Sequence, residues 1–541
     1  MTLDERIETI FPKIEDVPEK FFLKSSVSQK EYLINGELRV WEGKTQEVLS
    51  PISLVTSSGL SKITLGSYPI LTENESAEAL EAAKIAYNNG RGLWPALPVY
   101  DRINYMEGFL KRMKSSKKEI VALLMWEIGK PFHEAEREFD RTVDYITNSV
   151  EAMKFLNRTS SQFVIEKGII GQIRRAPLGV VLCMGPFNYP LNESFTTLIP
   201  ALLTGNTVIF KPPKIGVLLH YHLLKAFRDS FPPGVVNTVY GEGSQVITPL
   251  IVSGEIDMLA YIGSSRVADI LKSGHPRPHR FRAVLGLEAK NPAIILPDAD
   301  LDITIPECIE GSLSFNGQRC TALKILFVHH DIAGRFLDKF SEAIGNVSIG
   351  MPWHENVMIT PLPVTGKTEY LSRLITDARA YGAQILNPCG GKVNHTFMYP
   401  ALVFPVNKHM RLYSEEQFGP VVPVVPYDDI EVPIHYIVES SYAQQVSIFG
   451  NNQDTIGRLL DVLVNQVCRV NINSKCQRGP DIFPFAGRKD SGEGTLSVSD
   501  ALRAFSVRTI VAATETAKNK TIFQRIVRER RSNFLSTDVI P

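Results

Sequence analysis

The sequence has no excess of charge of either sign. Its 541 residues include 58 Lys plus Arg and 58 Asp plus Glu, so the formal net charge at pH 7 is zero. Proteins that bind nucleic acid through its phosphates need a basic surface, and this balance argues against that class of function. At three to four times the ~150 residues of a typical domain, the chain predicts at least two hydrophobic cores.

Long hydrophobic runs are also missing. The most apolar region, residues 197–210, is interrupted by Thr204, Gly205, Asn206 and Thr207, so no stretch reaches the ~18 apolar residues of a membrane span. The N-terminus, MTLDERIETIFPKIED, carries acidic residues and has no apolar signal core. We therefore expect no membrane segment and a cytoplasmic location.

Cysteine and histidine are too sparsely arranged to indicate a disulfide framework or a metal centre. The six cysteines form no CxxC pair and no dense framework, so we expect free thiols. Histidine pairs such as His275 with His279 combine with no carboxylate or cysteine set at ligand spacing. We predict no metal site.

Strand-like and helix-like segments alternate through most of the chain. Buried-type strands are expected at 180–184, 207–211, 235–240, 258–262 and 282–285, with helical stretches such as 216–229 between them. Such repetition requires right-handed crossovers and a mostly parallel sheet. We predict an α/β fold in which a doubly wound nucleotide-binding domain covers 31–160 and 179–287 and a second α/β domain, the catalytic one, covers 288–495. Three amphipathic helices are expected upstream, at 76–89, 100–127 and 131–156.

Three segments lie outside these two predicted domains. Residues 161–178 have the alternation of an exposed β-hairpin, which needs a partner strand. With 500–515 they predict an oligomerisation element, in which the hairpin pairs with the strand near 505–512 of a neighbouring copy in a symmetric dimer or tetramer. Residues 1–30 are interpreted as an extension outside the core, and 516–541 as a polar tail without an assigned fold.

Cys320 is the candidate nucleophile. It lies in FNGQRCTALK beside Arg319, and a cationic neighbour lowers a thiol pKa and so favours the reactive thiolate. A lone cysteine is otherwise more often inert and buried. This segment, together with PFNYP (186–190), FKPP (210–213), IGSS (262–265) and EEQFGPVVPV (415–424), resembles the aldehyde dehydrogenase superfamily in order and separation, from about Tyr32 to Ala512.

The resemblance implies a covalent mechanism on Cys320. The thiol attacks an aldehyde, and the oxyanion is held by the Asn188 amide and the Cys320 backbone N–H, which fits the need of a tetrahedral oxyanion for fixed donors. Without the resemblance, Asn188 would be interpreted as a turn residue before Tyr189 and Pro190.

The resemblance also implies a nicotinamide cofactor, although the sequence has no GxGxxG motif. The pyrophosphate would lie near the helix that follows Gly263 and Ser264, and Lys211 would contact the adenosine ribose. Lys214 stands where NAD-preferring relatives often carry a glutamate, so we predict NADP over NAD; the alternative is a solvated surface lysine. The remaining candidate cofactor residues are Pro186, Gly243, Glu416 and Phe418.

Arginines indicate the substrate class. Within the superfamily, GQRCTALK and NINSKCQRGPDIFPFAGRKDSGEG are similar to non-phosphorylating glyceraldehyde-3-phosphate dehydrogenases, which bind the substrate phosphate through arginines. The matching positions are Arg141, Arg319 and Arg478, and guanidinium groups suit a phosphate monoester well. The resemblance implies irreversible oxidation of glyceraldehyde 3-phosphate to 3-phosphoglycerate.

One segment departs from the family. The motif Leu-Glu-Leu-Gly-Gly-Lys supplies the general base of the superfamily, and here residues 285–290 read LGLEAK, with Gly286 in the carboxylate position. In an extended segment Glu288 would face the same side as Gly286, so either Glu288 is a displaced base or deacylation is slow or uses another acceptor. Two further alternatives stay open: a dehydrogenase of a non-phosphorylated semialdehyde, and a binding or structural member with impaired turnover.

Overall fold

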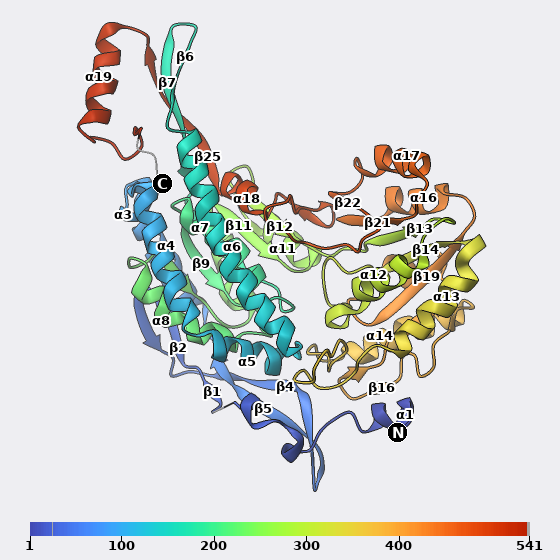
Figure 1. The fold of residues 1–541 in the computed structure, drawn as a ribbon. Coiled ribbons are helices and arrows are strands. Elements are labelled where there is room, and N and C mark those ends of the chain that lie inside the picture. Colours follow the sequence, from blue (N-terminus) through green and yellow to red (C-terminus); the bar gives the residue numbers. More distant parts are fainter. Residues whose placement is uncertain (24, 538–541) are drawn as a thin grey trace.

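Two large sheets of mainly parallel strands, each flanked by helices, form the body of the molecule (Figure 1). The computed structural model describes residues 1–23 and 25–537. A smaller three-stranded sheet projects from the body, with a helix beside it (Figure 1). The predicted α/β class is confirmed.

The first large sheet has six strands in the order β10-β9-β8-β11-β12-β24. Neighbouring strands are parallel except β12 and β24. The chain leaves β8 toward β9 and β10 on one side and returns to β11 and β12 on the other. Ligands of such sheets bind at this change of direction, beyond the carboxyl ends of the strands. The strands are β8 (Val180–Met184), β9 (Thr207–Lys211), β10 (Val236–Thr238), β11 (Met258–Ile262), β12 (Arg282–Gly286) and β24 (Gly492–Glu493).

Helices cover both faces of this sheet. The predicted helix over 100–127 is two helices, because Ser115 donates its hydroxyl to the carbonyl of Arg112 at 2.6 Å and so competes with helix continuation. The helices are α2 (Glu73–Tyr87), α4 (Val99–Lys114), α5 (Lys117–Ile128), α6 (Phe132–Thr159), α7 (Asn192–Leu203), α8 (Tyr221–Ser230), α10 (Thr248–Val252) and α11 (Ser265–Gly274).

The second large sheet has seven strands in the order β15-β18-β19-β14-β13-β21-β22, and only β15 is antiparallel to its neighbour. The strands are β13 (Pro292–Ile295), β14 (Ile325–His329), β15 (Gln384–Ile385), β18 (Ala401–Phe404), β19 (Val421–Tyr427), β21 (Gln445–Phe449) and β22 (Arg469–Ile472). The helices in this part are α12 (Leu301–Leu313), α13 (His330–Gly345), α14 (Lys367–Ala380), α16 (Glu431–Glu439) and α17 (Gln453–Leu463).

The N-terminal segment packs on the body, so the expectation that it stands outside the core is wrong. Four of its apolar residues, Ile7, Phe11, Val17 and Phe21, are buried in the main core, and the carbonyl of Phe21 accepts from the Trp126 indole at 2.7 Å. Their irregular spacing hides this burial from periodicity. Residue 24 of the predicted extension lies outside the described residues. The elements that follow are α1 (Leu3–Glu8), β1 (Val27–Ser28), β2 (Glu31–Ile34), β3 (Glu37–Val40), β4 (Thr45–Thr56) and β5 (Gly59–Pro69).

The predicted hairpin exists, but its partner strand belongs to the same chain. β6 (Phe163–Glu166) and β7 (Ile169–Pro177) form the hairpin, and β25 (Ser506–Thr514) pairs with β7 along its whole length. The predicted pairing with a neighbour's strand is therefore corrected, since β25 fills that place. An oligomer built on this element stays a prediction.

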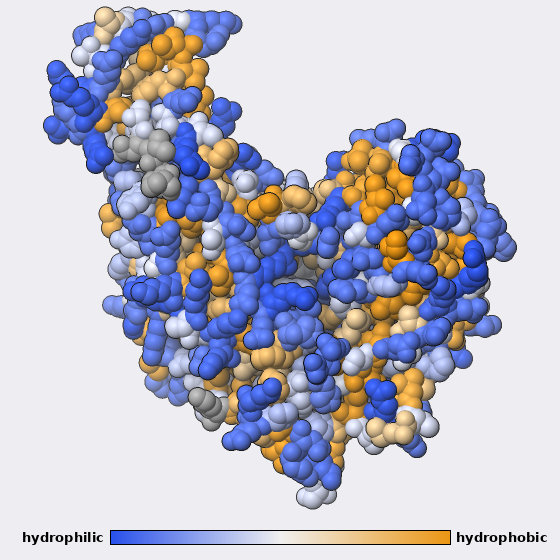
Figure 2. All heavy atoms as spheres, in the orientation of Figure 1, coloured by the Kyte–Doolittle hydropathy of each residue, from blue (hydrophilic) through white to orange (hydrophobic). Residues whose placement is uncertain are grey.

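The C-terminal segment also has a fold, contrary to expectation. Residues Ala517–Arg528 form α19, and Phe523 and Leu535 pack against Ile170 of the hairpin. Figure 2 shows apolar atoms gathered where α19 meets the hairpin. Residues 538–541 of the predicted tail lie outside the described residues. Within 1–23 and 25–537, no helix has both the length and the apolarity needed to cross a membrane.

Candidate functional site

A cavity of about 780 Å³ lies at the carboxyl ends of β8, β11 and β12. Residues from the part of the chain that contains the second large sheet line its other side. Six acidic and six basic side chains line it. The acidic residues are Glu134, Glu138, Glu193, Glu288, Glu310 and Glu416, and the basic residues are Arg137, Arg141, Arg319, Arg478, Lys214 and Lys475. The part of the chain that the structure describes holds no group of three or more His, Cys, Asp or Glu placed to bind a metal ion.

Twelve of the fourteen predicted site residues line this one cavity: Cys320, Asn188, Glu288, Pro186, Lys214, Gly263, Ser264, Glu416, Phe418, Arg141, Arg319 and Arg478. Lys211 and Gly243 do not line it. Lys211 is buried at the end of β9, with its Nζ 3.3 Å from the Pro212 carbonyl, and burial lowers its pKa to about 8. Gly243 begins the four-residue helix α9 (Gly243–Val246), outside the cavity wall.

A strained turn presents Cys320. Helix α12 is followed by a turn in which Phe315 and Asn316 have φ values of 48° and 58°, a region that side chains other than glycine rarely adopt. The Asn316 side chain holds this turn by bonds to the amide and hydroxyl of Thr360 at 2.8 and 3.1 Å. The Cys320 carbonyl accepts from Asn291 Nδ2 at 2.7 Å, so the backbone at the thiol is fixed on both sides.

The Cys320 thiol is not activated in the way the sequence predicts. Burial raises its pKa, and the nearby cations Lys324, Arg319 and Arg141 only partly oppose that effect. Two of these cations are already paired: Lys324 with Glu416, and Arg141 with Asp481. The expected lowering of the Cys320 pKa is therefore wrong for this structure, because desolvation outweighs neighbours whose charge is balanced elsewhere.

Asn188 lies in the loop between β8 and α7 and is held by a buried ion pair. Its Nδ2 donates to the Gln318 carbonyl at 2.8 Å, two residues before the thiol. Its own carbonyl accepts from Lys130 Nζ at 2.8 Å. Lys130 also pairs with Glu138, whose other oxygen accepts from the amides of Leu191 and Asn192 at 3.0 and 3.1 Å. The pair thus clamps the loop that places an amide donor beside the thiol.

The comparisons with known proteins agree with this arrangement. A model of the aldehyde dehydrogenase family matches residues 50–511. The chain belongs to the aldehyde dehydrogenase family. It is 34% identical over 447 residues to an NADP-dependent glyceraldehyde-3-phosphate dehydrogenase of Streptococcus equinus, covering 82% of this chain and 91% of the relative.

The names of other similar proteins include both the same substrate and a different one. The crystal structure of an NADP-dependent glyceraldehyde-3-phosphate dehydrogenase from Bacillus halodurans, complexed with NADP, has a TM-score of 0.82 and 31% identity, covering 90% of this chain and 99% of that one. A lactaldehyde dehydrogenase of Methanocaldococcus jannaschii is 28% identical, covering 86% of this chain and 96% of the relative. The family is therefore certain, while the names of relatives leave the aldehyde open.

In this aldehyde dehydrogenase, Glu416 and Phe418 line the part of the cavity where a nicotinamide and its ribose would bind. Glu416 is held by Lys324 and by the Ala289 amide at 3.1 Å, and Phe418 packs edge-on against Phe187 at 5.8 Å between ring centres. A fixed carboxylate and an aromatic face suit a ribose and the ring attached to it. These residues fit a nicotinamide nucleotide.

On the phosphate side of the cavity, two candidate cofactor contacts are made to carboxylates of the chain itself. The amide of Ser265, in the first turn of α11, donates to Glu288 Oε2 at 2.7 Å. Lys214, half exposed, pairs with Glu242 at 2.5 Å. A dinucleotide phosphate that binds the Ser265 N–H would compete with the Glu288 carboxylate for that donor.

The bond between the Ser265 amide and Glu288 also concerns the general base, which the family carries at the position of Gly286. Glu288 lines the cavity, yet its carboxylate caps α11 on the cofactor side. Gly286 leaves no carboxylate at the family's position. A Cβ there would lie 3.4 Å from the Ile262 side chain and 3.6 Å from that of Leu496, close to ordinary contact distances. A Cβ at 286 would therefore stand at ordinary contact distance from its neighbours, so packing around the backbone does not by itself require glycine there.

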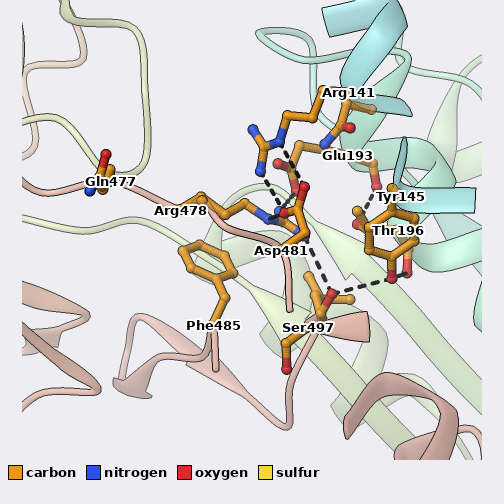
Figure 3. A network of polar contacts seen from close by, with 12 residues as sticks. Arg141, Tyr145, Glu193, Thr196, Gln477, Arg478, Asp481, Phe485 and Ser497 are labelled. Carbon is orange, nitrogen blue, oxygen red and sulfur yellow. Dashed lines mark hydrogen bonds and ion pairs between the residues drawn. The ribbon is translucent and has the colours of Figure 1, made fainter. Parts of the chain in front are cut away.

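The three arginines line the same cavity. Carboxylates already hold two of them, Arg141 and Arg478 (Figure 3). Arg141 makes two bonds to Asp481, at 2.9 and 2.7 Å, and Arg478 pairs with Glu193 and lies 3.3 Å from Asp481. Arg319 differs, because its Nη2 donates to the backbone carbonyls of Glu310 and Gly311 and, among the described residues, no carboxylate pairs with it; its buried Nε, like that of Arg478, has no hydrogen-bond partner there.

Sequence reasoning missed five residues of this site: Lys130, Glu138, Glu193, Lys324 and Asp481. Two of them left a signal. Glu193 is an acidic residue at the start of an otherwise largely apolar helical segment, and Asp481 follows Arg478 by three positions. Lys324 stands in the FNGQRCTALK segment, which does not indicate that it pairs with Glu416, and Lys130 and Glu138 lie in segments whose sequence gives no indication that they are near the cavity.

Proposed function

We propose that this chain oxidises a small aldehyde to the carboxylic acid with NADP as the electron acceptor, through a covalent adduct on Cys320. The observation that carries the proposal is the single cavity that contains Cys320, Asn188, Glu416 and Phe418. When bound, the nicotinamide supplies the hydride acceptor. Lys214 at the cavity wall supports NADP, since a cation favours an additional phosphate.

The proposed chemistry assigns each step to a residue. The Cys320 sulfur forms a bond to the carbonyl carbon and loses its proton to solvent water, and the Asn188 amide and the Cys320 N–H donate to the resulting oxyanion. As the carbonyl re-forms, the carbon gives up its hydride and a thioester remains on Cys320. Water then cleaves the thioester, releases the acid and returns the proton to sulfur.

The first substrate candidate is glyceraldehyde 3-phosphate. Its support is that Arg141, Arg319 and Arg478 line the same cavity as the thiol, and that relatives at up to 34% identity carry that name. The second candidate is an uncharged aldehyde of similar size. A specific observation favours it: Glu193 and Asp481 already occupy two of the three guanidinium groups.

The test is formation of NADPH by the purified chain without inorganic phosphate, with glyceraldehyde 3-phosphate and D-glyceraldehyde compared at equal concentrations. The matched control is Cys320→Ser, which should abolish reduction with both. Absence of NADPH with every aldehyde, including in a single turnover at high protein concentration, would support instead a binding or structural role for a member that lacks the base at position 286.

A further inference from the structure

The Arg478 guanidinium is buried between two carboxylates (Figure 3). Its side chain is 5% exposed, and those of its partners Glu193 and Asp481 are 7% and 9% exposed. Asp481 also holds Arg141 by a two-bond contact. Two cations and two anions therefore cancel within one buried cluster at the cavity wall.

Glu193 cannot easily leave this cluster. It lies in the first turn of α7, where the helix dipole stabilises a carboxylate, and every residue of α7 is buried. Displaced from Arg478, the carboxylate would remain in a dry environment without its cation. A buried charge that loses its partner is strongly destabilising.

This arrangement conflicts with the charge of a phosphate monoester, which carries nearly two negative charges. The cluster of Arg141, Arg478, Glu193 and Asp481 has no net charge to offset that of a phosphate. Of the three arginines, Arg319 alone has no carboxylate partner among the described residues. A hydroxyl substituent has no such difficulty, because it can donate to a carboxylate and accept from a guanidinium without adding charge.

We propose that Glu193 is a specificity residue: by occupying Arg478 it makes the cavity favour an aldehyde with uncharged, hydroxylated substituents over a phosphorylated one. The proposal rests on the proposed function in that it concerns the substrate of the same cavity. It chooses the second of the two substrate candidates and names the residue responsible.

The test is equilibrium binding of glycerol 3-phosphate, which has the phosphate but no aldehyde, measured by calorimetry on the NADP-loaded chain. Glu193→Gln keeps the size and the oxygen acceptor but removes the charge. We expect it to bind glycerol 3-phosphate at least about tenfold more tightly than the unaltered chain, as a charge-assisted contact to Arg478 becomes available. The gain should disappear in the double variant Glu193→Gln with Arg478→Met.

Glu134→Gln is the matched control. Glu134 also lines the cavity, but it pairs with the exposed Arg137 at 2.8 Å and not with Arg478. It removes the same charge from the wall and should change the affinity by less than twofold. An equal gain in both variants would reduce the effect to net charge and overturn the role of Glu193, and so would no gain in Glu193→Gln.

A second measurement needs no variant. The ratio of kcat/KM for D-glyceraldehyde to that for glyceraldehyde 3-phosphate should exceed one in the unaltered chain, and a ratio well below one would overturn the inference even if Glu193→Gln failed to fold. The binding experiment requires no turnover. Failure of the proposed function, seen as no NADPH from any aldehyde, is therefore distinguishable from failure of this inference.

Discussion

Replacing Lys130 by methionine tests whether the buried ion pair behind the Asn188 loop serves catalysis. Lys130 and Glu138 are both fully buried, and the Lys130 ammonium also lies 3.6 Å from the centre of the Tyr189 ring. Methionine fills much of the same volume without the charge. The Asn188 carbonyl loses its donor, and the Glu138 carboxylate loses its cation but keeps the two amides of Leu191 and Asn192.

The structure sets the size of both expected effects. Removing one partner of a buried pair costs ~3–5 kcal/mol of stability, of which the two remaining amide bonds to Glu138 recover a part. If the loop then releases Asn188, one oxyanion donor is lost, which reduces kcat by roughly 10²–10³. The KM for NADP should stay unchanged, because Lys130 lies on the thiol side and not among the candidate cofactor residues.

The assay combines NADPH formation with thermal unfolding of the same preparations. The double variant Lys130→Met with Glu138→Gln leaves no unpaired charge and keeps an oxygen acceptor for the Leu191 and Asn192 amides, so it should regain thermal stability while kcat stays low. A purely structural role would instead restore both together. The reasoning is refuted if Lys130→Met keeps kcat within twofold of the unaltered chain.

Four further outcomes are expected. Cys320→Ser should lower kcat by on the order of 10⁶, measured as NADPH formation at saturating aldehyde, as for removal of other covalent nucleophiles. Lys214→Glu should raise the KM for NADP about 10- to 100-fold and leave that for NAD nearly unchanged, since one charge-assisted contact to the extra phosphate is lost. Burial raises the pKa of Glu127 from 4.5 to about 7, so the folded chain holds this proton more tightly than the unfolded one. Stability should accordingly fall by ~3 kcal/mol as pH rises from 4.5 to 7, and Glu127→Gln should flatten that part of the pH profile of thermal unfolding. Gly286→Glu should raise the steady-state rate about a hundredfold if thioester hydrolysis is limiting, while the first-turnover burst of NADPH stays the same.

The sequence predicts the two α/β halves well because their strands are continuous buried runs between helices, a pattern that depends on local residues alone. It fails where the fold joins distant segments. β25 returns to β7 of its own chain, and the N-terminal apolar residues reach the core, but neither pairing is encoded in a local period.

The candidate site divides in the same way. The resemblance to a family predicts that Cys320, Asn188 and the arginines belong to one site, because it identifies matching sequence positions. It does not predict which residues these side chains contact. Asp481, the partner of Arg141, lies 340 residues away in the chain, and Glu193, one of the two partners of Arg478, lies 285 residues away, so these two contacts could not be predicted from the neighbouring sequence. The second partner of Arg478, Asp481, is only three residues away. The prediction of a lowered Cys320 pKa is wrong for the same reason, since burial by distant segments raises the pKa more than the adjacent Arg319 lowers it.

The geometry separates two halves of the reaction that a typical aldehyde dehydrogenase combines. The groups that we propose for thioester formation share the cavity: a thiol on a fixed backbone, a clamped amide donor and a carboxylate suited to the ribose. For hydrolysis, Gly286 supplies no base, and Glu288 is bound to the first turn of α11. A dinucleotide phosphate that binds the Ser265 N–H would compete with Glu288 for that donor, so we expect any contribution of Glu288 to hydrolysis to depend on the cofactor being bound. A Glu288→Gln variant therefore has to be assayed both for NADP affinity and for hydrolysis, since a change in the first alone makes Glu288 a competitor of the cofactor rather than a base.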